Sequence, residues 1–162
     1  RMYEEYVIGF VKPDILIGRR PVSDERINQE TAILGGKVAT LTPLRAVNSR
    51  DPKPILHASI SCKWTIRSDR AQNARTEGLN LIRNRQGNTP HIVVVTAEPL
   101  PTRIASVALG TGDIDCVYHM AFHELADTVH QVGDETLSEI WNLLVNGKRL
   151  RDVSDLPFDL AI

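Results

Sequence analysis

The sequence predicts a mixed α/β domain in which a β-sheet of about five strands is flanked by helices. A continuous β-branched run at residues 91–97 is typical of a central strand that is buried on both faces. Segments with helical periodicity lie between this run and the other strand-like segments. With 162 residues, of which 42% are apolar and 24% charged, the chain can bury a core, and we expect one domain over residues 1–162.

The strand-like segments are short, β-branched or alternating in character, and bounded by turn residues. Pro13 interrupts the first of them, and because proline cannot donate to the ladder it indicates an edge, a strand start or a bulge. The expected strands lie at residues 6–11 with an extension at 14–17, within 33–41, and at 55–64, 91–97 and 115–118.

The longest expected helix begins after the N-cap pair Ser68-Asp69 and ends before Gly87. Glu77 stands on a mostly polar face of this helix, beside its apolar stripe. The stripe is formed by Ala71, Ala74, Gly78, Leu79 and Ile82, and the polar face by Arg70, Asn73, Glu77 and Leu81. The expected helices are 68–85, 104–109, 121–132 and 135–145.

Composition excludes several classes of function. Aromatic residues make up only 5% of the chain, which disfavours a platform that stacks single-stranded bases. The sequence contains neither an apolar run of membrane-spanning length nor a signal peptide at its start. The two cysteines, Cys62 and Cys116, have no metal-binding or redox spacing, so we expect a cytoplasmic protein without a membrane partner.

Positive charge is concentrated in the middle of the chain. Residues 45–85 hold nine basic residues against three acidic ones, whereas residues 111–162 hold ten acidic residues against three basic ones. Of the 19 cationic residues, 14 are arginine, whose planar fork pairs with phosphates and guanine edges. The basic block indicates an anionic partner on one face, and a solvated helix face is the alternative.

Three ionisable residues are candidates for metal-assisted phosphodiester hydrolysis. Asp14 and Glu77 offer the hard oxygen ligands that Mg²⁺ prefers, and Lys63 offers a positive charge beside the attacked phosphate. Pro13-Asp14 followed by Ser61-Cys62-Lys63 matches the PD…(D/E)XK nuclease pattern, with Ser61 in place of the second acid. Because serine supplies no carboxylate, Glu77 is the obvious replacement. Each residue taken alone is more often a turn or a surface charge.

The segment from Ser61 to Asn84, SCKWTIRSDRAQNARTEGLNLIRN, extends this motif far beyond a chance match. Together with residues 89–118 it closely resembles the type II restriction endonucleases that recognise CCGG-containing sites, within the PD-(D/E)XK group. The resemblance covers residues 12–125 and implies a restriction-endonuclease-like core and Mg²⁺-dependent cleavage of double-stranded DNA, at GCCGGC or another palindrome containing CCGG.

The resemblance also implies roles for individual residues. Asp14 and Glu77 correspond to metal-binding carboxylates, with the backbone carbonyl of Cys62 as a further ligand. Lys63 corresponds to the catalytic lysine, and Ser61 is the departure that this subfamily tolerates in the catalytic motif.

The resemblance implies that three residues at the start of the long helix, and one beyond the central strand, recognise the bases of the DNA. Arg67, Asp69 and Arg70 correspond to the residues that read the inner bases, since arginine can donate to guanine O6 and N7 and aspartate can accept from cytosine N4. Arg103 corresponds to the contact with the outer G·C pair. A palindrome read in halves implies a homodimer or a homotetramer.

Members of this family are markedly longer, so we expect the chain to be their C-terminal catalytic portion. Three alternatives stay open. A DNA-binding module without cleavage would follow if an essential acid lies in the missing portion. A structure-selective nuclease would share the core without base readout. A zinc-dependent hydrolase would use His119, His123 and His130, of which the first two are spaced four residues apart.

Overall fold

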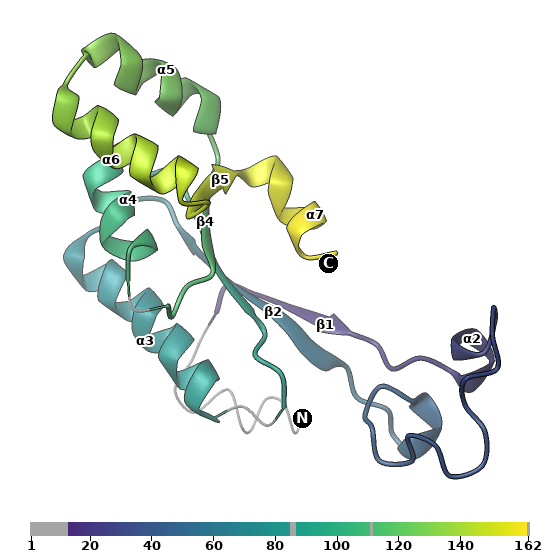
Figure 1. Cartoon of the computed structure of the whole chain (residues 1–162). Coiled ribbons are helices and arrows are strands. Elements are labelled where there is room, and N and C mark those ends of the chain that lie inside the picture. The colour runs from purple at the N-terminus through teal and green to yellow at the C-terminus, as the bar shows by residue number, and fades with distance from the viewer. Residues whose placement is uncertain (1–12, 85–86, 111, 162) are drawn as a thin grey trace. The chain divides into compact units, whose positions relative to one another are not determined.

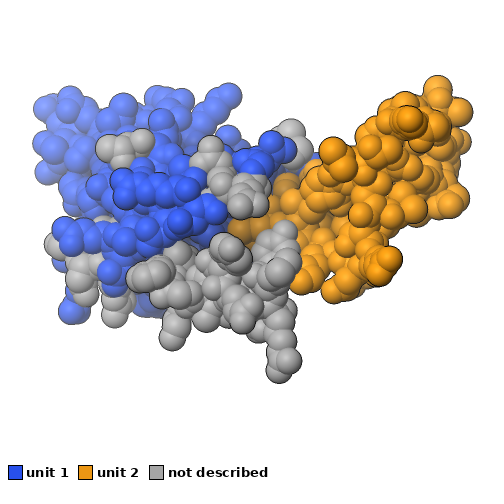
Figure 2. Space-filling view, turned by 90° about the horizontal axis from the view of Figure 1, so that it is seen from below, with its two compact units in different colours: residues 1–16, 58–162 blue, residues 17–57 orange. Residues whose placement is uncertain are grey.

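The structure, a computed structural model, describes residues 13–84, 87–110 and 112–161, except for the side chains of residues 68–71. The backbone divides into two compact units, which Figure 2 shows in different colours. Unit 1 comprises residues 1–16 and 58–162, and unit 2 comprises residues 17–57. The strand expected at residues 6–11 lies outside the described residues.

A five-stranded sheet, with its strands in chain order, is the centre of the fold. Strands β2 to β5 are parallel neighbours, and Figure 1 shows β1 running antiparallel to β2. The prediction of a mixed sheet of about five strands is therefore confirmed. The strands are β1 (Ile15–Arg19), β2 (Ile55–Lys63), β3 (His91–Thr96), β4 (Cys116–His119) and β5 (Leu150–Asp152).

The parallel register aligns polar residues at one edge of the sheet. Lys63 pairs with Thr96, Thr96 with His119, and His119 with Asp152, so the carboxyl ends of β2 to β5 meet there. Residues paired across a sheet share a face. Two residues inward on the same face, Ser61 is followed across the sheet by residues that are at most 1% exposed, namely Val94, Val117 and Leu150.

Helices connect the parallel strands, as right-handed crossover connections require. The longest, α3 (Ser68–Asn84), packs beside α4 (Pro101–Ala108), which in turn packs beside α6 (Glu135–Asn146) (Figure 1). The remaining helices are α5 (Phe122–Val132), α7 (Leu156–Asp159), α2 (Asp24–Ile27) and the 3-10 helices η1 (Ala46–Asn48) and η2 (Val153–Asp155). Among the described residues, every helix is too short or too polar to span a lipid bilayer.

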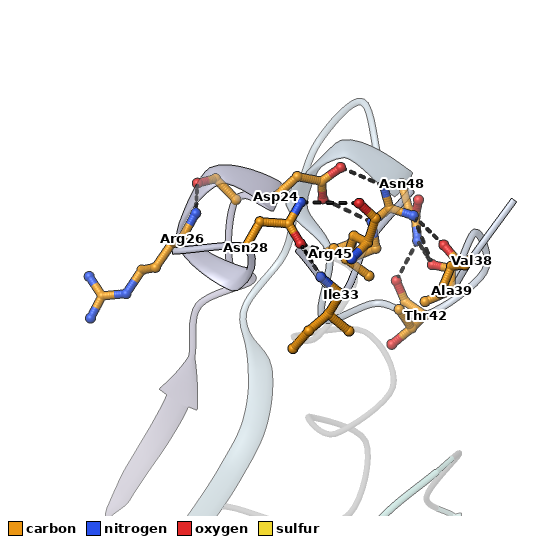
Figure 3. A network of polar contacts seen from close by, with 11 residues as sticks. Asp24, Arg26, Asn28, Ile33, Val38, Ala39, Thr42, Arg45 and Asn48 are labelled. Carbon is orange, nitrogen blue, oxygen red and sulfur yellow. Dashed lines mark hydrogen bonds and ion pairs between the residues drawn. The ribbon is translucent and has the colours of Figure 1, made fainter. Parts of the chain in front are cut away.

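The prediction of a strand within residues 33–41 is wrong, because this segment forms turns. Asn28 and Asn48 satisfy its backbone with side-chain hydrogen bonds instead of a ladder (Figure 3). Asn28 Oδ1 accepts from the backbone N–H of Leu34 at 2.8 Å, and Asn48 Nδ2 donates to the carbonyl of Ala39 at 3.0 Å. Such local side-chain bonds compete with strand pairing.

Arg45 holds the same unit together from a partly buried position. Its Nε donates to Oδ1 of Asp24 at 2.9 Å, its Nη2 bonds Oδ2 of the same carboxylate, and its Nη1 donates to the carbonyl of Val38 at 2.6 Å (Figure 3). The hydrogen bond from Arg45 lowers the pKa of Asp24. Arg45 is thus a structural residue of unit 2, and a bidentate pair fixes its guanidinium geometrically.

Other element boundaries differ from the sequence-based expectation in smaller ways. Helix α4 begins at Pro101, three residues before the expected start, because proline suits the first turn of a helix. Leu81 is only 7% exposed and belongs to the core with Ala74 and Gly78, not to the polar face of α3. Strand β5 has only three residues, too few to show the alternation of apolar and polar residues that is typical of a strand, so the sequence did not predict it.

Gly78 allows α3 to lie close against the sheet, and a substitution at this position tests the packing. A Cβ at position 78 would lie 2.7 Å from the carbonyl oxygen of Asp113 and 3.3 Å from Cγ2 of Ile92. We expect Gly78→Ala to lower the free energy of unfolding by about 1–2 kcal/mol, since overpacking outweighs the gain in helix propensity. Denaturant unfolding measures this change.

The matched control is Gly35→Ala, where a Cβ would meet nothing within 4 Å. We expect this variant to stay within about 0.5 kcal/mol of the parent chain. Equal stability of Gly78→Ala and Gly35→Ala would contradict the close packing of α3.

Candidate active site

Asp14 contacts the carboxyl end of β2, although 48 residues separate it from its first partner there. Its Oδ2 accepts a hydrogen bond from the backbone N–H of Cys62 at 2.7 Å and lies 3.5 Å from Nζ of Lys63. The Asp14 side chain is 46% exposed and that of Lys63 is 19% exposed, so both remain accessible to a ligand. The ammonium of Lys63 is thereby held beside the Asp14 carboxylate.

Glu77 reaches the same strand from α3. Its Oε2 accepts a hydrogen bond from the Ser61 hydroxyl at 3.2 Å. Ser61 and Lys63 are two residues apart on β2, so they share a face of the sheet. The structure therefore brings Asp14, Lys63 and Glu77 to one strand end, where Ser61 orients Glu77 in place of the acid in the nuclease pattern.

The oxygen atoms at this strand end have the chemistry that a hard divalent cation prefers. Among the described residues, Asp14 accepts its hydrogen bonds through Oδ2, and Glu77 accepts its hydrogen bond through Oε2. The other oxygen of each carboxylate remains to bind a cation. In an extended strand, the N–H and C=O of one residue point to the same side. Because the N–H of Cys62 points to Asp14, its carbonyl oxygen is directed to that side as well.

No group of three or more histidine, cysteine, aspartate or glutamate side chains that could hold a metal ion is found in the part of the chain that the structure describes. A cation bound between Asp14 and Glu77 would thus complete its shell with the Cys62 carbonyl, water or phosphate oxygens, which is the usual situation for Mg²⁺.

Arginine side chains gather beside α3 and α4, around an open hollow of about 650 Å³. Arg67 from the loop before α3 and Arg103 from the first turn of α4 both line the hollow and are exposed. Arg75 also lines it, and its Nη2 donates to the carbonyl of Ser106 at 2.6 Å. The structure therefore places two predicted base-reading residues on one surface. The predicted readers Asp69 and Arg70 have side chains outside the described part of the structure.

The basic block of residues 45–85 is divided between the two units, and within unit 2 Arg45 is paired with Asp24. The positive charge that concerns the site comes from Lys63, Arg67 and Arg75 of this block and from Arg103 beyond it. The distribution of charge along the sequence did not predict that Arg103 joins these residues, because Arg103 is brought beside them only by the packing of α4 against α3.

His119 is a packing residue of β4. It is 2% exposed, its Nε2 lies 3.0 Å from the carbonyl oxygen of Glu98, and its Nδ1 accepts from the backbone N–H of Ala121 at 3.0 Å. His123 lies on α5 beyond the end of the strand, so the two histidines do not share a helix face. Both ring nitrogens of His119 are thus used by the backbone, which removes the basis of the zinc alternative.

A comparison with known proteins identifies the family. The model of the family described as NgoMIV restriction enzyme matches residues 2–162. The chain belongs to the NgoMIV restriction enzyme family. A curated relative, the type II restriction enzyme NgoMIV of Neisseria gonorrhoeae, is 57% identical over 152 residues, which cover 94% of this chain and 52% of the relative. The chain therefore spans about half the length of this relative.

A solved structure, that of the restriction endonuclease PspGI in complex with substrate DNA, also aligns with the chain. It covers 64% of this chain and 39% of its own, at 17% identity and a TM-score of 0.40. Family membership rests on the family model and the curated relative alone.

Sequence reasoning missed two residues beside the site. Arg75 was counted only as part of the basic block, and Glu98 was not considered. The signal for Glu98 is its position two residues after a buried parallel strand, because acidic residues just beyond such strands lie at the edge where ligands bind.

The thiol of Cys62 provides a chemical probe of this strand end. Burial raises the pKa of Cys62, the negative charge of Asp14 raises it further, and the charge of Lys63 opposes both. We expect Asp14→Asn to lower the Cys62 pKa and to speed its alkylation by iodoacetamide about two- to threefold at mildly alkaline pH, because only the thiolate reacts. Mass spectrometry of the modified peptide measures the rate.

Two comparisons make the result specific. Burial raises the pKa of Cys116 to about 11, so this second thiol is an internal reference that reacts slowly in both proteins. Asp127→Asn removes an exposed carboxylate of α5 and should leave the Cys62 rate unchanged. A rate for Asp14→Asn equal to that of Asp127→Asn would contradict the contact between Asp14 and Cys62.

Proposed function

We propose that this chain is the catalytic portion of a Mg²⁺-dependent type II restriction endonuclease that hydrolyses duplex DNA at a palindrome containing CCGG. The observation that carries the proposal is the convergence of Asp14, Lys63 and Glu77 on the carboxyl end of β2, in a member of a restriction enzyme family. Ligands of sheets with parallel strands bind at this edge.

Asp14, Glu77 and the carbonyl of Cys62 would hold Mg²⁺, and the ion would supply Lewis-acid stabilisation of the scissile phosphate. Lys63 holds its ammonium 3.5 Å from Asp14, where it can hydrogen-bond the attacking water and offset charge on the phosphoryl oxygens. Ser61 keeps the Glu77 carboxylate turned toward β2. Cleavage would leave a 5′-phosphate and a 3′-hydroxyl.

Recognition of the inner bases would come from the start of α3. Arg67 can donate a fork to guanine O6 and N7, and we assign the same role to Arg70 and the cytosine contact to Asp69. Arg103, from the neighbouring helix, would read the outer G·C pair of a GCCGGC site. The placement of Arg67 and Arg103 around one hollow supports a shared reading surface.

A palindromic target supports an oligomer. One set of readers covers half of a two-fold symmetric site, so a second copy related by a two-fold axis is needed for the whole site. We therefore propose a homodimer or a homotetramer as the DNA-bound form.

The second candidate is a DNA-binding module without cleavage activity. The observation that favours it is that the chain spans about half the length of the curated relative. Both candidates require binding of CCGG duplexes, and only the nuclease requires a strand break.

Lys63 separates the two candidates. We expect the chain to nick or linearise a plasmid carrying GCCGGC in Mg²⁺, and Lys63→Ala to lower the rate by about a hundredfold or more, as the loss of one stabilising donor does elsewhere. Gel electrophoresis of the plasmid gives the rate, and a plasmid without the site is the substrate control.

Lys37→Ala is the matched variant, since it removes an exposed lysine from unit 2. It should cleave at the rate of the parent chain. Binding of the GCCGGC duplex without cleavage in Mg²⁺ or Mn²⁺ would favour the binding module. Equal cleavage by Lys63→Ala and Lys37→Ala would exclude the proposed role of Lys63.

Arg67 tests base reading against structure-selective binding. We expect Arg67→Ala to reduce the preference for a CCGG duplex over one with an altered inner pair by about 1–3 kcal/mol, because a bidentate guanine contact is lost. Fluorescence anisotropy at fixed salt, in the absence of Mg²⁺, measures both affinities.

The control is Arg83→Ala, which removes an exposed charge at the far end of α3. It should weaken binding to both duplexes to the same small extent. If Arg67→Ala also weakens both duplexes equally, the protein is a structure-selective binder without base readout.

A further inference from the structure

Glu98 carries a carboxylate that is completely withdrawn from solvent. It is 0% exposed and lies two residues beyond β3, in the loop that leads to α4. A buried carboxylate is costly unless hydrogen bonds and opposite charge compensate for the lost water. The identity of its partners therefore indicates what the residue is for.

Both oxygens of Glu98 bind segments that are far apart in the chain. Oε2 accepts from the backbone N–H of Ile66 at 2.7 Å, across 32 residues. Oε1 accepts from the backbone N–H of Leu100 at 3.2 Å and lies 3.7 Å from Nη1 of Arg103. One side chain thus joins the loop before α3 to the start of α4.

These partners adjoin the proposed base readers. Ile66 is 2% exposed and directly precedes Arg67, so anchoring its N–H fixes the backbone from which Arg67 projects. Leu100 is the N-cap of α4, and Arg103 lies in the first turn of that helix. The Arg103 side chain is 50% exposed, which leaves it able to reach DNA while its guanidinium faces the Glu98 carboxylate.

Glu98 is itself fixed from the sheet. Its N–H donates to Oγ1 of Thr96 at 3.1 Å, and its carbonyl oxygen lies 3.0 Å from Nε2 of the buried His119. Thr96 and His119 are paired in register at the ends of β3 and β4. The backbone of Glu98 is therefore fixed to the same edge of the sheet that carries Lys63.

We propose that Glu98 is a positioning residue for DNA recognition, which sets the placement of Arg67 relative to Arg103 and so couples the reading of inner and outer base pairs. The inference rests on the proposed function. Because Glu98 is buried it does not contact DNA, and its effect on specificity is transmitted through the backbone of Ile66 and Leu100 and through the guanidinium of Arg103.

The test is Glu98→Gln, which keeps the size of the side chain and one acceptor oxygen. Its NH₂ group must face either the backbone N–H of Ile66 or the backbone N–H of Leu100 and the guanidinium of Arg103, so the two segments cannot both stay bound. Three short duplexes serve as probes: one bears GCCGGC, one has an altered inner pair, and one has an altered outer pair. Fluorescence anisotropy in the absence of Mg²⁺ gives an inner and an outer discrimination ratio.

The matched control is Asp115→Asn. The Oδ2 of Asp115 accepts the backbone N–H of Ile92 at 2.7 Å, which is the same kind of bond at the opposite end of β3. Asparagine keeps one acceptor oxygen, so this substitution removes the negative charge from the bond to Ile92 without touching the reading segments. Arg103→Ala is the second comparison, because it should change the outer ratio alone.

We expect the parent chain to discriminate by about five- to 150-fold at each altered pair, in line with one good base contact. Glu98→Gln should lower both ratios by about fivefold or more, whereas Asp115→Asn should lower neither. Amide hydrogen exchange provides a readout without DNA: the amides of Ile66 and Leu100 should exchange faster in Glu98→Gln and at the parent rate in Asp115→Asn.

The outcomes separate the two proposals. If the parent chain discriminates and Glu98→Gln keeps both ratios, the positioning role is overturned and the proposed function stands. A loss confined to the outer ratio also overturns it, because Glu98 would then act on Arg103 alone. A parent chain that does not discriminate overturns the proposed function and this inference together. If Glu98→Gln does not fold, Glu98→Asp, whose shorter side chain cannot span both segments, replaces it under the same criteria.

Discussion

The parallel pairing of β2, β3 and β4 is the constraint on which both parts of the site depend. It brings Lys63, Thr96 and His119 into one row at the carboxyl edge of the sheet, although they are far apart in the chain. Each connection that leaves this row then carries functional groups: the segment after β2 leads to Arg67 and α3, and the segment after β3 leads to Glu98 and α4. Parallel strands impose this arrangement because every connection must return across the sheet before the next strand begins.

Three carboxylates accept the same kind of hydrogen bond but serve different roles. Asp14, Glu98 and Asp115 each accept a backbone N–H at 2.7 Å from another segment of the chain. What distinguishes them is access to solvent: Glu98 is fully buried and can only position its neighbours, whereas the Asp14 side chain is 46% exposed and can also bind a ligand. Burial, more than residue type, therefore decides whether an acid of this fold serves structure or chemistry.

The two units are stabilised in different ways. Unit 1 buries β-branched and aliphatic side chains on both faces of the sheet, with Val94 and Val117 at 0% exposure. Unit 2, which has no buried residue among positions 17–57, depends on polar contacts from Asn28, Arg45 and Asn48 to the backbone and to Asp24 (Figure 3). Bonds of this kind fix turns locally, and they explain why a basic residue such as Arg45 is unavailable to an anionic ligand.

The sequence by itself determined the central strand, the long helix and the family resemblance. The β-branched run at 91–97 and the capped, periodic segment at 68–85 express short-range preferences that packing reinforced. The motif also selected Asp14, Lys63 and Glu77, the three side chains that the fold brings to one strand end. Only the tertiary structure decided that residues 33–41 form turns, that β5 exists, and that Glu98 joins two distant segments. The physical reason is that these features depend on hydrogen-bond partners supplied by remote parts of the chain, and no local pattern of residues records where those partners will lie.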